Sequence, residues 1–240
     1  MGQLSPRQLK ILKAIVDEYV ISGTPVGSEL LEKKYKLGIS PATVRNEMVR
    51  LVDMGYLKQP HTSAGRIPTT NAFRLYIGEL MREKEMSVKD EVQIKQELWD
   101  IRRNFEQLAR NSAYILAQRT KLLAVALTEN RNIYYSGAAY ILDIPEFYDI
   151  DVTKAVLALM DQQTVLRQVL EKMIWSSGVS VLIGEELNVN YLEPCGFVFS
   201  RFETAYTGGV IGVIGPTRIN YPYVMPVVRY FGGFISQAGK

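Results

Sequence analysis

The sequence predicts an α+β protein with an N-terminal winged helix-turn-helix, a long connecting helix and a reduced α/β regulatory domain. Three observations predict this class. Short amphipathic segments separated by Gly and Pro fill the first 85 residues, and residues 87–119 contain neither Gly nor Pro. Beyond residue 120, short β-rich runs are mixed with helical patterns. We therefore divide the chain into residues 1–85, 86–119 and 120–240.

Three short helices are expected in the first module. Ser5-Pro6 and Ser40-Pro41 each combine an N-cap residue with a proline in the first turn, and Ser28 is expected to cap the helix between them. The third helix ends at Gly55 and has an apolar stripe formed by Val44, Met48, Leu51 and Val52. This order of helices is typical of a helix-turn-helix.

A β-hairpin is expected next, with strands at residues 56–59 and 66–68 around a turn at 60–65. Thr69 or Thr70 would then cap a fourth helix. A hairpin that follows a helix-turn-helix forms a winged helix, and its tip is the wing.

The outer face of the third helix has the side chains that a DNA recognition helix needs. Arg can bond guanine bidentately, Asn can bond adenine, and an Ala or Thr methyl can contact thymine. The candidate DNA-binding residues on this helix are Ser40, Ala42, Thr43, Arg45, Asn46 and Arg50. Those in the wing are His61, Thr62, Ser63, Gly65 and Arg66, where a small-residue tip allows close approach to phosphates or to the minor groove. The alternative is a winged helix that binds protein instead of DNA.

Residues 87–119 are expected to form one long helix. Apolar residues from Ile94 to Ile115 follow heptad spacing, interrupted by Ser112. Two interpretations stay open: the helix packs along its own C-terminal domain, or it forms a self-pairing seam that holds a homodimer together.

The last third of the chain is expected to contain strands at residues 122–127, 179–183, 197–202 and 210–214, with helices at 152–173 and 224–235. The charge differs between the ends of the chain. Residues 1–85 carry 13 Lys or Arg and 9 Asp or Glu, a net charge of +4, whereas residues 140–240 carry 7 and 10, a net charge of −3. A basic module on an acidic body fits a DNA-binding head on a regulatory domain.

Composition argues against most enzyme classes. With one cysteine, Cys195, and one histidine, His61, the chain offers no disulfide framework and no metal site built on several imidazoles. Neither a nucleophile elbow nor a phosphate-binding glycine loop occurs. We therefore expect no catalytic residues, no metal and no cofactor. No apolar run is long enough to span a membrane and no targeting segment is evident, so a cytoplasmic protein is expected.

Four segments closely resemble the heat-inducible transcription repressors of the HrcA family. They are PVGS (25–28), SPATVRNEM (40–48), PHTSAGRIPT (60–69) and FRLYI (73–77). The resemblance resumes in IPEFYD (144–149), IGEE (183–186) and GVIGVIGPTRINY (209–221), so it covers nearly the whole chain.

This resemblance implies a repressor of chaperone operons that binds double-stranded DNA as a homodimer, at an inverted-repeat operator called CIRCE. It also implies a GAF-like regulatory domain with an inserted dimerisation domain, and release of the operator on heat stress. The GroE chaperonin would be the partner that keeps the repressor competent.

One large departure from the family pattern lies between residues 129 and 132. The family carries about a hundred residues there, including most of the inserted dimerisation domain, and this chain has two or three. We therefore expect a shortened form whose helix at residues 94–115, together with the sheet edge, takes over dimerisation. A regulator whose GAF-like domain senses a small molecule is the alternative function.

Overall fold

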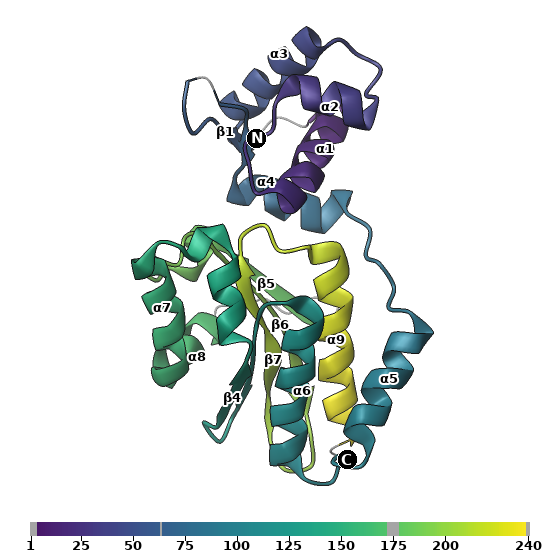
Figure 1. Cartoon of the computed structure of the whole chain (residues 1–240), viewed down its shortest axis with the longest axis vertical. Helices are drawn as coiled ribbons and strands as arrows, with labels where there is room; N and C mark the ends of the chain where they lie inside the picture. Colours follow the sequence, from purple (N-terminus) through teal and green to yellow (C-terminus); the bar gives the residue numbers. More distant parts are fainter. Residues whose placement is uncertain (1–3, 63, 172–177, 239–240) are drawn as a thin grey trace. The chain divides into compact units, whose positions relative to one another are not determined.

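The structure is a computed structural model that describes residues 4–62, 64–171 and 178–238. It divides into two compact units, Met1–Arg82 and Glu83–Lys240 (Figure 1). The segment 86–119, expected as a connector, lies within the second unit. Among the described residues, no helix combines the length and the hydropathy that crossing a membrane requires.

The first unit is a winged helix-turn-helix, as the sequence predicts. Its elements are α1 (Pro6–Ser22), α2 (Ser28–Tyr35), α3 (Pro41–Asp53), β1 (Leu57–Lys58), β2 (Ile67–Pro68), α4 (Thr70–Leu75) and the π-helix η1 (Tyr76–Leu80). The Oγ atoms of Ser5 and Ser40 accept the N–H groups of Gln8 and Thr43, so these two predicted N-caps are formed. The prediction that Ser28 caps α2 is wrong, because Gly27 is the N-cap and no side chain bonds there. Strands β1 and β2 pair in antiparallel register and form the base of the wing.

Apolar side chains from α1, α3 and α4 form the core of the first unit. Leu12, Ile15, Val44, Leu51 and Phe73 are all at most 1% exposed. The predicted stripe of α3 therefore faces inward, and its opposite face stays in solvent.

A partly buried hydrogen bond links η1 to α1. The Tyr76 hydroxyl donates to Asp17 Oδ1 at 2.7 Å. Burial, and then this bond to the carboxylate, raise the pKa of Tyr76. The phenol therefore stays protonated and remains a donor.

The second unit contains a five-stranded antiparallel sheet in the order β4-β3-β7-β6-β5. The strands are β3 (Leu123–Thr128), β4 (Ile133–Ser136), β5 (Val179–Ile183), β6 (Cys195–Glu203) and β7 (Gly208–Pro216). Four of them match predicted runs; β4 does not, because its four residues are too few to produce a clear alternation of polar and apolar side chains. The mixed composition confirms the α+β class.

Helices cover both faces of this sheet (Figure 1). One face carries α6 (Phe105–Thr120) and α9 (Tyr221–Ala238), with α5 (Val88–Trp99) beside α9. The other carries α7 (Ile150–Asp161), α8 (Gln163–Glu171) and the 3-10 helices η2 (Ala138–Asp143) and η3 (Pro145–Phe147). A further 3-10 turn, η4 (Gly184–Leu187), follows β5. The helix expected at 152–173 is divided between α7 and α8, and its last residues lie outside the described part of the chain.

The prediction of one long helix over residues 87–119 is wrong. The chain turns between Trp99 and Phe105, and Asn104 starts the new helix by accepting the N–H of Gln107 at 3.1 Å. Without Gly or Pro, the sequence contains only this N-cap asparagine as a sign of the break. The turn lets both α5 and α6 pack against the same sheet-covering helix, α9.

This packing buries most of the heptad positions and leaves Ile101 and Phe105 half-buried. Ile94, Leu98, Leu108 and Ser112 are 0% exposed within a single chain. A second copy has no access to them, so the expectation that this segment forms the dimer seam is wrong, and the alternative of packing on its own domain is confirmed.

Candidate nucleic-acid interface

The recognition helix α3 presents most of its predicted residues to solvent. Ser40, Ala42, Arg45, Asn46 and Arg50 are exposed, and Thr43 is half-buried. The hydroxyls of Ser40 and Thr43 lie 3.0 Å apart, which fixes the first turn of the helix. A recognition helix contacts base edges chiefly through its N-terminal residues, so Arg45 and Asn46 are well placed to do so.

Arg50 has a different environment from Arg45. Its Nη1 donates to Glu47 Oε1 at 3.2 Å, and Glu47 is 6% exposed. The same carboxylate accepts Gln8 Nε2 at 3.2 Å and lies 3.8 Å from Arg7 Nη1. Glu47 therefore links α3 to the start of α1. Sequence analysis missed this role because Glu47 falls beside the apolar stripe, where a carboxylate is not expected to be buried.

The wing is built by backbone contacts with the segment that precedes α2. Val26 and Arg66 form an isolated β-bridge, with two N–H to carbonyl bonds of 2.9 Å. A Cβ at Gly65 would lie 2.4 Å from the Val26 carbonyl oxygen, so only glycine fits there. The predicted small-residue tip thus has a steric cause that the sequence did not reveal.

Arg66 and Gln59 brace the loop from inside. Arg66 Nη1 donates to the carbonyl of Ala64 at 3.2 Å, and Gln59 Nε2 donates to the carbonyl of Thr62 at 2.7 Å. His61 and Thr62 are exposed, while Gly65 and Arg66 are half-buried. Ser63, the remaining predicted wing residue, lies outside the described residues.

Arg45 and Arg66 line one cleft of about 250 Å³ between α3 and the wing. The N-terminal turn of α2, from Gly27 to Glu29, forms its third wall. Two guanidinium groups from different elements therefore share a concave site, with the helix-terminal N–H groups beside them. Such a site suits the anionic backbone of DNA.

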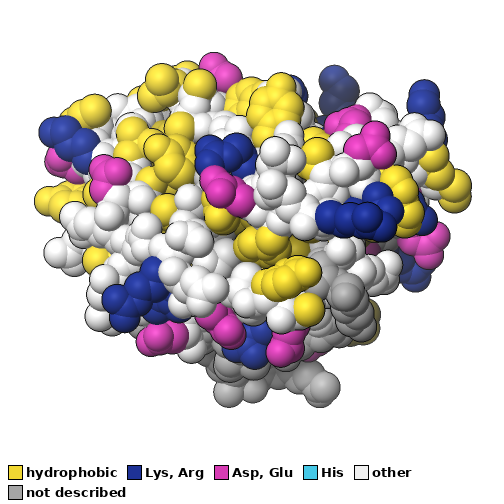
Figure 2. Space-filling model, turned by 90° about the horizontal axis from the view of Figure 1, so that it is seen from below, with side chains coloured by type: hydrophobic (Ala, Val, Ile, Leu, Met, Phe, Trp, Pro, Cys, Tyr) yellow, Lys and Arg dark blue, Asp and Glu magenta, His cyan; other side chains and the backbone are white. Residues whose placement is uncertain are grey.

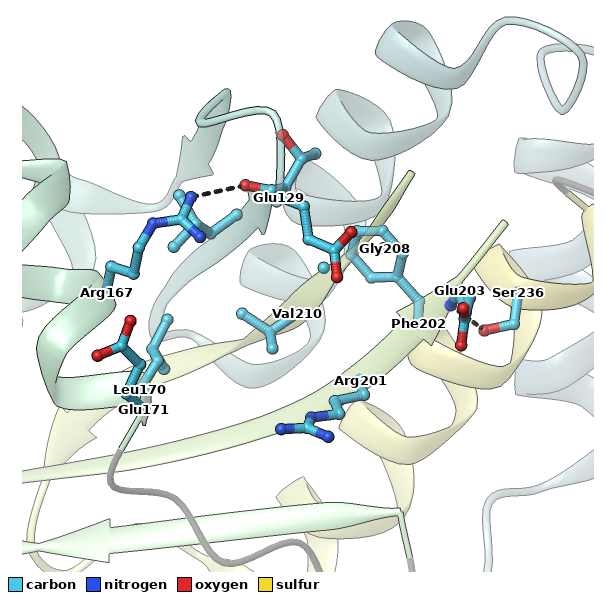
Figure 3. A pocket seen from close by; sticks show the side chains of 13 residues that line it. Glu129, Arg167, Leu170, Glu171, Arg201, Phe202, Glu203, Gly208, Val210 and Ser236 are labelled. Carbon is cyan, nitrogen blue, oxygen red and sulfur yellow. Dashed lines mark hydrogen bonds between the residues drawn. The ribbon is translucent and has the colours of Figure 1, made fainter. Parts of the chain in front are cut away.

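The second unit has a cleft of its own, about 550 Å³ in volume (Figure 3). Charges of both signs line it, with Arg167 and Glu171 on α8, Glu129 after β3, and Arg201 and Glu203 on β6. Arg167 Nη2 donates to the carbonyl of Thr128 at 3.0 Å, which ties α8 to β3. The mixture of charges does not single out one class of ligand.

On the face shown in Figure 2, Lys and Arg side chains alternate with Asp and Glu, with apolar side chains between them. In the part of the chain that the structure covers, no three His, Cys, Asp or Glu residues are grouped to hold a metal ion. Cys195 is 0% exposed, and burial raises the pKa of its thiol to about 12, which keeps it unreactive.

Comparisons with known proteins agree with this geometry. Residues 3–94 match the family described as "Winged helix-turn-helix transcription repressor, HrcA DNA-binding", and residues 71–225 match "HrcA protein C terminal domain". The chain is 28% identical to the heat-inducible transcription repressor HrcA of Pelotomaculum thermopropionicum, with 98% of this chain and 97% of that protein aligned. It is 26% identical to that of Symbiobacterium thermophilum, over 99% of each chain.

The first of these alignments is 336 positions long, so at least 96 positions lack a residue in this 240-residue chain. A solved structure titled "Crystal structure of a hypothetical protein at 2.2 A resolution" has the same fold. Its TM-score is 0.76 at 17% identity, and 98% of each chain is covered.

Proposed function

Since the chain belongs to the HrcA family of heat-inducible winged-helix transcription repressors, we propose that it represses chaperone operons by binding a CIRCE-type inverted repeat in double-stranded DNA. The observation that supports this most is the cleft lined by both Arg45 of α3 and Arg66 of the wing. In the proposal, α3 lies in the major groove, and Arg45 and Asn46 contact base edges there. Ser40, Ala42 and Thr43 lie at its N-terminal end.

The wing has a separate role in the proposal. Arg66, His61, Thr62 and Gly65 contact phosphates or the minor groove, where charge and close approach matter more than base identity. Arg50 is expected to contribute less than Arg45, because the Glu47 carboxylate bonded to its Nη1 offsets part of its charge.

The proposal includes a homodimer, because an inverted repeat presents two half-sites related by a two-fold axis. It also includes the GroE chaperonin as the partner that keeps the repressor competent until heat stress, and a cytoplasmic location. These parts are supported by the family resemblance. A repressor family is not an enzyme class, so no catalytic role is proposed.

The test is fluorescence anisotropy with a labelled CIRCE duplex, a scrambled duplex and a single half-site, over a range of salt concentrations. Sequence-specific binding requires tighter binding to CIRCE, by about 10³-fold or more over the scrambled duplex. The logarithm of the binding constant should fall linearly with the logarithm of salt concentration. Equal affinity for all duplexes contradicts the proposal.

A second candidate function is a repressor whose second, GAF-like domain senses a small molecule, for which the 550 Å³ cleft has a suitable size. Thermal shift against a metabolite panel separates the two. A ligand that raises the melting temperature and changes operator affinity favours small-molecule sensing. An effect of chaperonin alone favours the first function.

A further inference from the structure

The outer edge of β4 is open. β4 is the last strand of the sheet, and within residues 4–62, 64–171 and 178–238 it pairs with β3 alone (Figure 1). The strand at the opposite edge of the sheet, β5, begins one residue after residues 172–177, which the structure does not describe.

The direction of the β4 backbone groups follows from two bonds of β3. The N–H of Thr128 donates to the carbonyl of Asn132 at 3.0 Å, and the N–H of Glu129 donates to the carbonyl of Gly208 on β7 at 2.9 Å. Because peptide groups alternate in direction along an antiparallel ladder, Tyr134 and Ser136 bond to β3. The N–H and carbonyl groups of Ile133 and Tyr135 therefore point outward, away from β3.

Nothing in β4 protects this edge except its shortness. Edge strands are usually blunted by charged residues, proline or a bulge. The segment Ile133–Ser136 has the sequence IYYS, pairs without a bulge, and has Tyr135 at 51% exposure. Among the described residues, no hydrogen bond reaches the outward groups of Ile133 and Tyr135. They are free to accept another strand.

We propose that the occupant is β4 of a second copy, paired antiparallel across a two-fold axis at Tyr134. The outward N–H and carbonyl groups of one copy must face those of the other, so Ile133 of each copy lies opposite Tyr135 of its partner. These two residue pairs form four backbone hydrogen bonds between the copies. The sheets then join into one of ten strands, five from each copy. This inference depends on the proposed repressor function in one respect, which is that an inverted repeat requires a two-fold symmetric dimer. It identifies the interface of that homodimer.

Charge at the axis favours a second copy. The strand itself is uncharged, and the Arg110 guanidinium lies over the Tyr134 ring, 5.7 Å from its centroid. Glu106 neutralises Arg110 through a 3.0 Å bond. The two copies therefore bring a pair of neutral ion pairs to the axis instead of like charges. A charged strand from an unrelated protein would find no unpaired opposite charge at this edge of β4.

Cysteine cross-linking tests the register directly. In Tyr134→Cys, the two introduced residues face each other as a non-hydrogen-bonded pair about 4.5 Å apart at Cα, a separation that a disulfide bridges. Cys195 is fully buried and does not compete. The control, Tyr135→Cys, places its thiol opposite Ile133 of the partner, so we expect rapid cross-linking of the first variant and little of the second. Equal cross-linking of both, or of neither, overturns the register.

Sedimentation tests the interface without a new thiol. Tyr135→Pro removes only an outward N–H, so β3–β4 pairing survives and the dimer dissociation constant should rise about tenfold or more. Tyr135→Phe is the matched control and should dimerise as the wild type does. A wild-type monomer at micromolar concentration, or a dimer that Tyr135→Pro leaves unchanged, overturns the inference. Binding of each protein to a single operator half-site is measured in parallel. Loss of that binding indicates a failure of the DNA-binding proposal and not of the dimer interface.

Discussion

The backbone N–H of Lys84 donates a 2.8 Å hydrogen bond to the carbonyl oxygen of Pro222 in the first turn of α9. This carbonyl is available because Pro226, four residues later, has no N–H to complete the helical ladder. Next to it, Glu83 and Arg229 form a two-point ion pair with bonds of 2.6 and 2.8 Å. A proline inside a helix thus becomes an attachment point for the segment that begins the second unit.

The Glu83–Arg229 pair should make stability depend on pH. The hydrogen bond from Arg229 lowers the pKa of Glu83 below 4.5. Its contribution is therefore complete at pH values above 4.5 and disappears as the pH falls through the lowered pKa. Because the pair is partly exposed, Glu83→Gln should cost about 1 kcal/mol or less at pH 7.

Urea unfolding of the wild type and of Glu83→Gln, at pH 7 and at pH 3, measures the difference in the free energy of unfolding. The cost of Glu83→Gln should be smaller at pH 3 than at pH 7, and the exposed Glu85→Gln is the control. A cost that is as large at pH 3 as at pH 7 shows that the pair does not supply it.

Arg45→Ala should reduce sequence discrimination. If Arg45 bonds a guanine bidentately, its removal costs about 1–3 kcal/mol per half-site on CIRCE and little on scrambled DNA. Anisotropy with both duplexes measures the difference. Arg50→Ala is the matched control on the same helix, and should cost less because Arg50 is bonded to Glu47. Equal weakening on both duplexes rules out base contact by Arg45.

Arg66→Ala should instead weaken binding to all duplexes alike. Loss of one phosphate contact reduces the slope of log K against log salt by about 1. Arg66→Lys keeps the charge and should keep the slope, although it loses the bond to the Ala64 carbonyl. An unchanged slope in Arg66→Ala assigns the side chain to loop structure alone.

Gly65→Ala should distort the wing while the helices remain folded. Its Cβ would overlap the Val26 carbonyl at 2.4 Å, and relief requires moving backbone, at a cost of about 1–3 kcal/mol. We expect weaker operator binding with little change in the circular dichroism of the helices. Gly78→Ala, which has nothing within 4 Å of the new Cβ, is the matched control and should bind normally. Full affinity in Gly65→Ala would show that the wing tolerates the shift.

Cys195 should be inert in the native protein. Burial raises the pKa of its thiol to about 12, so almost no thiolate exists at pH 8. A thiol reagent should therefore react only after denaturation, and the stoichiometry should then be one per chain. Fast reaction of the native protein would contradict the burial of Cys195 and would require a Cys195→Ser background for the cross-linking test.

Local chemistry explains why the winged helix is predictable. Ser5 and Ser40 cap helices because their hydroxyls bond N–H groups three residues away, and the spacing from Val44 to Leu51 defines a buried stripe within one helix. The exposed positions of Arg45 and Asn46 follow from that stripe. These features depend on neighbours in the chain, so the sequence by itself determined them.

Tertiary contacts decided the rest. Whether the apolar residues from Ile94 to Leu108 face a second copy or their own domain depends on α9, more than a hundred residues away, and the turn before Asn104 lets them pack inward. Gly65 is needed because the Val26 backbone lies against it. The open edge of β4 exists because β3 pairs with β7 on its other side. Packing between distant segments has no local signature, so only the folded structure reveals it.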